Sequence, residues 1–250
     1  MTSQLKRFMS HLKFVLILFF TLFLSSCVSL VKKSPTFDAD IAQVKTIAVL
    51  PADIEVYQLS AGGVRELIDE WSDKAKADTA DALKKHLAER YGFQIKFIDE
   101  QWLKDNHKEA WNDNLALYNA VAYSALLHAY PGDNTFPDKM KNFDYTLGQE
   151  IQDLAKICEA DALLFVYGVD HEATAGRTAL LVWNLLMGAA TGITIIPTNP
   201  TSMSMGLVDG KAGDMTWFKV SAPGQEYSFR NEKHMDVLIE WFTKDFLSKK

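Results

Sequence analysis

The chain has 250 residues, of which 48% are hydrophobic and 23% are charged, and its formal net charge is −6. This acidic balance disfavours nucleic acid and anionic lipid as partners, because both carry negative charge themselves. Two cysteines are too few for a fold held together by a network of disulfides.

The N-terminus has the pattern of a secretory signal peptide. Lys6, Arg7 and Lys13 precede an apolar run at 14–24, and such signals combine a basic region with an apolar one. The run has 11 residues, whereas a helix needs about 20 to cross the hydrocarbon core of a bilayer. The pattern therefore predicts a signal peptide over residues 1–26 that is cleaved rather than retained.

The apolar run ends in the sequence Leu-Ser-Ser-Cys at 24–27. This segment resembles the lipobox of bacterial lipoproteins, which has an aliphatic residue and two small residues before a cysteine. The resemblance implies cleavage before Cys27 and lipidation of this residue with fatty acids such as palmitate, which makes the lipid bilayer a partner. The alternative is an ordinary signal followed by a buried or free cysteine. Val28 stands where aspartate resembles an inner-membrane retention signal, so we expect an outer-membrane location facing the periplasm.

Lipidation leaves Cys158 as the remaining thiol, so no intrachain disulfide can form. Cys158 ends an amphipathic helical pattern, where a lone cysteine is expected to be a small buried hydrophobe and not a catalytic nucleophile.

Removal of the signal also removes three positive charges, which takes the formal net charge from −6 to −9. Residues 27–41 contain Pro35 and have no sustained periodicity, so we predict a lipidated tether there, up to roughly 45 Å long when extended. Residues 42–250 have the length and apolar content of a single α/β domain.

The domain is predicted to begin with a β-α-β unit. An apolar strand is expected at 45–51, a long helix at 65–91 ended by Gly92, and an alternating strand at 93–99. This order favours a right-handed crossover and parallel pairing of the two strands.

A helical middle region is expected from 101 to 158, interrupted by a loop at 130–137. A buried strand follows at 160–169 and leads into Asp170, His171 and Glu172. These three residue types could ligate a metal, but adjacent residues of a strand point to opposite faces. We therefore interpret them as a polar strand end and predict no metal site.

An uncharged segment at 178–199 is the least usual internal feature. Its strongly apolar part spans about 12 residues, which is shorter than a membrane span. The sequence favours burial or a protein interface over membrane contact, and both interpretations stay open.

Two alternating strands around a glycine-containing turn at 210–213 predict an antiparallel hairpin. An amphipathic helix is expected at 231–247. Together these elements predict an α/β fold, with a mixed β-sheet, a βαβ start, a C-terminal antiparallel hairpin and helices packed on the sheet.

A possible ligand site lies at 53–65. Gly62 and Gly63 are predicted in a turn between a strand and a helix, where backbone amides could cradle an anion and Arg65 could assist. Asp53 and Glu55 could act as an acid and a base nearby. The turn lacks the spacing of known phosphate-binding loops, so solvated loop residues are the alternative, and we predict no catalytic residues and no cofactor.

A broader resemblance rests on the lipobox, the strand at 47–51, the strand beginning at 160 and the hairpin at 207–217. In this order they are similar to a broad group of bacterial lipoproteins that includes the curli-secretion lipoprotein CsgG and has a fold similar to the amino-terminal domain of TolB. The resemblance implies a non-enzymatic role in envelope assembly, secretion or regulation.

Two hypotheses follow. The first is an outer-membrane lipoprotein that acts as an assembly, secretion or interaction component, and that associates with itself or with another envelope protein. The second is a periplasmic enzyme or small-ligand binder that uses the 53–65 loop.

Overall fold

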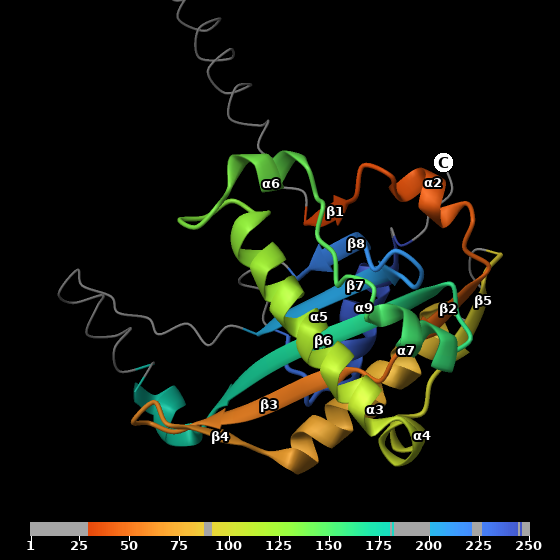
Figure 1. Cartoon of the computed structure of the whole chain (residues 1–250). Helices are drawn as coiled ribbons and strands as arrows, with labels where there is room; N and C mark the ends of the chain where they lie inside the picture. The colour runs from red at the N-terminus through yellow and green to blue at the C-terminus, as the bar shows by residue number, and fades with distance from the viewer. Residues whose placement is uncertain are drawn as a thin grey trace, which may run out of the picture.

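The computed structural model describes residues 30–87, 92–180, 182, 201–221, 227–244 and 246. The predicted signal peptide, Cys27 and nearly all of the 178–199 segment lie outside the described residues. The described chain is built on one mixed sheet with the strand order β1-β8-β7-β6-β2-β5, in which β3 pairs with β6 and β4 with β3 (Figure 1).

The strands are β1 Val31–Lys33, β2 Thr46–Val49, β3 Asp53–Leu59, β4 Arg65–Leu67, β5 Gln94–Phe97, β6 Ala162–Ala173, β7 Ser202–Asp209 and β8 Met215–Val220. The helices are α2 Phe37–Ile41, α3 Asp69–Leu87, α4 Glu100–Asn106, α5 Lys108–His128, α6 Pro137–Lys141, α7 Ile151–Ile157 and α9 Glu232–Lys244. This arrangement confirms the predicted mixed α/β fold.

Strand β6 is the longest of these strands and organises the sheet. Its first half pairs in parallel with β2 and its second half in parallel with β3, while β7 pairs antiparallel along its other edge. Pro51 lies between β2 and β3. It has no backbone N–H to donate to β6, so the pairing with β6 is interrupted there and two strands result.

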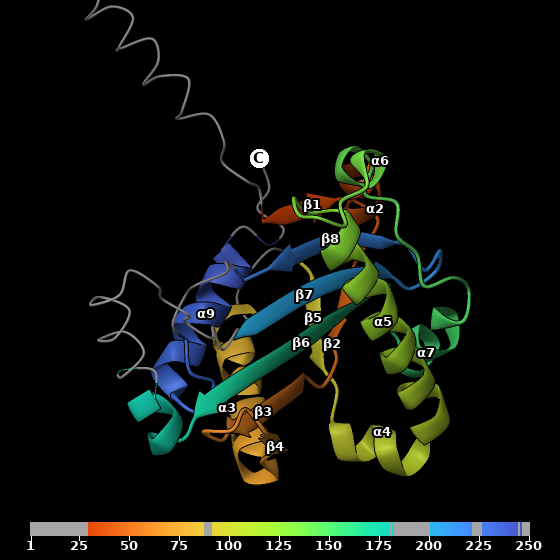
Figure 2. The ribbon, with the colours of Figure 1, turned by 90° about the vertical axis from the view of Figure 1, so that its left-hand side faces the viewer.

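Helices cover both faces of the sheet (Figure 2). One core lies under α3 and α9 and includes Leu164 and Val166 of β6. A second core lies under α4, α5 and α7 and includes Leu163 and Phe165. The alternation of side chains along a strand explains this division, because successive residues point to opposite faces. The result is three layers, with the sheet in the middle.

The β-α-β start is confirmed, since β2 and β5 are parallel and α3 leads into β5, but the β3–β4 hairpin lies between β2 and α3. The C-terminal hairpin is confirmed as well, because β7 and β8 are antiparallel neighbours. Helix α9 follows and packs against α3, where Lys85 and His86 lie 2.7 and 2.8 Å from carboxylate oxygens of Asp236.

The predicted helix start at Arg65 is wrong. Residues 65–67 form β4, which pairs antiparallel with β3, and α3 begins at Asp69. A tight turn makes this hairpin: Gly63 has a φ of 81°, and the Ser60 hydroxyl accepts a hydrogen bond from the Val64 N–H at 3.0 Å. The apolar residues before Asp69 have helical spacing, but the hydrogen bonds between β3 and β4 hold residues 65–67 in a strand.

The tether prediction also differs from the structure. Within 27–41, β1 pairs antiparallel with β8, and α2 buries Phe37 in the core beneath α9. A strand of three residues and a helix of five are too short to give the sequence a readable periodicity. Only the few residues between Cys27 and β1 remain for a tether.

Candidate functional site

The five residues predicted at 53–65 lie on one β-hairpin. Asp53 and Glu55 belong to β3, Gly62 and Gly63 to the turn, and Arg65 to β4. The two glycines therefore connect two strands and do not precede a helix. The predicted anion site required a helix N-terminus directly after the turn, and the structure has a strand there.

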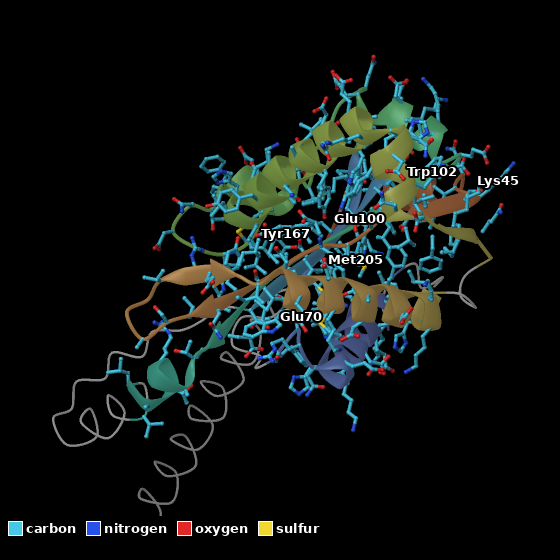
Figure 3. All side chains as sticks on the ribbon, turned by 90° about the horizontal axis from the view of Figure 1, so that it is seen from below. Lys45, Glu70, Glu100, Trp102, Tyr167 and Met205 are labelled. Carbon is cyan, nitrogen blue, oxygen red and sulfur yellow. The ribbon has the colours of Figure 1, made fainter. Side chains whose placement is uncertain are left out.

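The sheet register brings other side chains to the two carboxylates. Asp53 lies opposite Tyr167 of β6, and Tyr57 lies opposite His171. Together with Glu55 these residues share the face of the sheet on which α5 packs, and Figure 3 shows Tyr167 between β3 and α5. We call the set Asp53, Glu55, Tyr57, Tyr167 and His171 the polar face; each of its members is half-buried.

Both carboxylates of the polar face have a hydrogen-bond donor. The side-chain amide of Asn119 on α5 donates to Asp53 Oδ2 at 2.8 Å, and the Tyr57 hydroxyl donates to Glu55 Oε2 at 2.9 Å. This hydrogen bond, together with partial burial, raises the pKa of Tyr57 above its usual value. Partial burial, with the charge of Glu55 beside it, raises the pKa of Tyr167 as well. The two hydrogen bonds hold the carboxylates along the sheet surface.

Aromatic contacts complete the polar face. The rings of Tyr57 and His171 stack with their centroids 5.5 Å apart and their planes 17° apart. The Arg65 guanidinium carbon lies 5.5 Å from the centre of the Tyr57 ring, within the range of a cation–π contact. The carboxylates, the stacked rings and the guanidinium are suited to contact with another polar surface.

The predicted polar strand end at 170–172 divides between the two faces of the sheet. His171 belongs to the polar face, whereas Asp170 is 2% exposed on the side of α3 and α9. There Asp170 accepts hydrogen bonds from the Thr201 hydroxyl at 2.5 Å and from the Phe229 N–H at 2.8 Å. Among the described residues, no group of three or more His, Cys, Asp or Glu side chains is placed to hold a metal ion.

The sequence did not predict the hollow between α2, α7 and the turn after β7, which has a volume of about 730 Å³. Its lining includes Asp161 and Asp209, and both carboxylates bind backbone. Asp161 accepts from the N–H groups of Lys45 and Thr46, and Asp209 from those of residues 211 and 212. These contacts fix loops, and no local motif marks the hollow because its residues come from distant segments.

Cys158 lies on the α7 side of the sheet and is 4% exposed. Burial raises the pKa of its thiol to about 11, so the reactive thiolate is scarce at neutral pH. The prediction of a buried, small hydrophobe is confirmed.

Within the described residues, no helix combines the length and the apolar character that crossing a membrane requires. Of the 178–199 segment only residues 178–180 and 182 are described, and Leu180 and Val182 are exposed.

No family model matches the chain, and no curated protein matches it. Solved structures resemble its fold distantly. The PelC dodecamer from Paraburkholderia phytofirmans has 8% identity and a TM-score of 0.39, over 88% of this chain and 96% of that one. Lipoprotein GNA1162 from Neisseria meningitidis has 14% identity and a TM-score of 0.34, over 82% and 97%. The LpoB C-terminal domain from Salmonella enterica has 10% identity and a TM-score of 0.29, over 76% and 94%.

GNA1162 is a lipoprotein, and none of the three structures is similar enough to this chain to assign an activity. A function is therefore inferred from the residues and contacts of the chain itself.

Proposed function

We propose that the chain is a lipoprotein of the outer membrane, anchored through Cys27 and facing the periplasm, that acts as a non-enzymatic assembly, secretion or interaction component. One observation carries this proposal: the lipobox at 24–27 ends only four residues before β1, the first strand of the folded domain. The predicted signal peptide, the lipidation site and the folded domain follow one another directly in the sequence, which is the order that a lipid-anchored domain requires.

The contacts of the polar face support a non-enzymatic role. The two carboxylates that would serve as acid and base, Asp53 and Glu55, are each engaged by a neutral donor. The Gly62–Gly63 turn has no helix N-terminus behind it. An enzyme or ligand binder centred on 53–65 thus lacks the geometry that suggested it.

We further propose that the partner is another copy of the chain or a second envelope protein, and that it contacts the polar face. The exposed side chains of Tyr123 and Leu126 on α5 continue this surface beyond Asn119, because residues three and four apart lie on one side of a helix. Tyrosine side chains are enriched at protein interfaces.

Labelling of cells with radioactive palmitate tests the anchor. We expect label on the native chain, none on Cys27→Ala, and full label on the matched control Cys158→Ala, which removes the buried thiol. Fractionation is expected to place the native chain in the outer membrane, and crosslinking in whole cells to give a discrete oligomer or partner. Unlabelled protein in the soluble periplasm would overturn the proposal.

A further inference from the structure

We infer that one end of the domain lies against the bilayer surface, and that this end is formed by β1, the loop at 131–136 and α6. The inference rests on the proposed lipidation of Cys27. It adds an orientation to the anchor: these elements face the lipid, and the β3–β4 hairpin faces away from it.

The first argument is the length of the chain outside the fold. Val31, the first residue of β1, follows Cys27 by four positions, so an extended chain spans about 14 Å between them. A domain of this size has a radius of gyration of about 17 Å. A tether shorter than that radius cannot let the domain turn freely, so the elements around β1 must lie next to the bilayer.

The start of the domain is also firmly held. The Leu30 carbonyl accepts hydrogen bonds from the Val220 N–H and from the Tyr130 hydroxyl, each at 3.2 Å. Lys32 Nζ donates to the Met140 carbonyl of α6 at 3.1 Å. These contacts join β1 to β8, to the loop after α5 and to α6, so the short tether positions a rigid surface.

The second argument is the character of that surface. Phe136 is 54% exposed and Met140 is 39% exposed, although both are large and apolar. Lys141 is exposed next to Met140 in α6, and Lys33 is exposed on β1, where its ammonium lies 4.3 Å from the centre of the Phe37 ring. Apolar side chains that enter the boundary of headgroups and acyl chains, flanked by lysines that reach the phosphates, are typical of proteins that lie on a membrane.

The arrangement in space is consistent with these arguments. Figures 1 and 2 both show α6 beside β1 at one end of the molecule, with the β3–β4 hairpin at the other. The charge of this end is mixed, because Asp133, Asp138 and Asp144 lie among its lysines and Lys139 pairs with Asp144 at 2.7 Å. In a chain that is acidic overall, such a surface would orient a domain that is already anchored rather than recruit it from solution.

The test uses the mature lipidated protein, reconstituted in phosphatidylcholine vesicles. Single cysteines are introduced as Phe136→Cys or Met140→Cys and labelled with an environment-sensitive fluorophore. The native cysteines give little background, since Cys27 carries lipid and Cys158 is buried. The matched control is Val64→Cys in the β3–β4 turn, an apolar residue that is 68% exposed at the opposite end.

We expect a blue shift of the emission at Phe136→Cys and at Met140→Cys, and loss of fluorescence when spin-labelled lipid is added. At Val64→Cys we expect neither change. Mass spectrometry of the same samples reports whether Cys27 carries acyl chains. Acylated protein with unquenched probes at both test positions would overturn the orientation and leave the anchor intact, as would quenching at Val64→Cys alone. Protein without acyl chains would overturn the proposed function itself.

Discussion

The second half of β6 presents two faces made from alternate residues of one strand. Gly168 and Asp170 lie on the face toward α3 and α9, where Asp170 is buried and accepts a hydrogen bond from the backbone N–H of Phe229. Tyr167 and His171 point toward the other side, where they remain half-buried on the polar face. One set of residues of this strand therefore packs in the closed core, and the alternate set forms a surface for contact. The extent of burial distinguishes the two sets better than the type of residue does.

The largest effect is expected from Asp170→Ala. This change leaves the buried Phe229 N–H and the Thr201 hydroxyl without their acceptor, which should lower the free energy of unfolding by about 3 kcal/mol. Urea unfolding followed by tryptophan fluorescence measures it. The matched control is Asp53→Ala on the polar face, where a half-buried carboxylate is lost and about 1 kcal/mol is expected. Equal losses in the two variants would remove the distinction between the faces.

A smaller loss is expected from Gly168→Ala. An added Cβ would lie 2.8 Å from Ile54 Cδ1 and 2.8 Å from Phe229 Cε2, so the core must shift, at about 1–3 kcal/mol. The control Gly62→Ala meets no side-chain atom closer than Ser60 Oγ at 3.9 Å, and its effect should stay within about 0.5 kcal/mol. Thermal unfolding compares the two. A Gly168→Ala protein as stable as the native chain would show that the closed core has room to adjust.

The smallest effect on stability is expected at the stacked pair of the polar face. A double-mutant cycle with Tyr57→Ala and His171→Ala should give a coupling free energy below about 1 kcal/mol, as cross-strand pairs do. Crosslinking in cells should fall clearly in the same variants, because the pair lies in the proposed contact surface. Unchanged crosslinking would place the contact elsewhere, and a coupling as large as the Asp170 effect would assign the pair to the fold.

Much of the fold is predictable because its signals are local. The strand at 46–49, the hairpin of β7 and β8 and the helix at 232–244 each show their period within one segment. Strands β1 and β4 were missed because three residues carry no period of their own, and pairing with β8 and β3 creates them. The sequence also indicated the buried state of Cys158, since an amphipathic pattern leads up to it.

The candidate site was less accessible to prediction. Asp53 and Glu55 were found as neighbours in sequence, but the partners that define their environment come from distant elements. Asn119 reaches Asp53 from α5, and His171 reaches Tyr57 from β6. No spacing along the chain encodes either contact, because both depend on how α5 and β6 pack in the finished sheet.

The hydrogen bond between Asp170 and Thr201 bears on how long a connection between β6 and β7 the sheet can tolerate. It joins β6 to the residue that precedes β7, next to the paired neighbours Val169 and Ser202. Closing a longer loop between fixed ends costs only about 0.6 kcal/mol for each doubling of its length. A connection of different length between the end of β6 and Thr201 should therefore change the stability of the sheet little, because this hydrogen bond fixes where the chain enters β7.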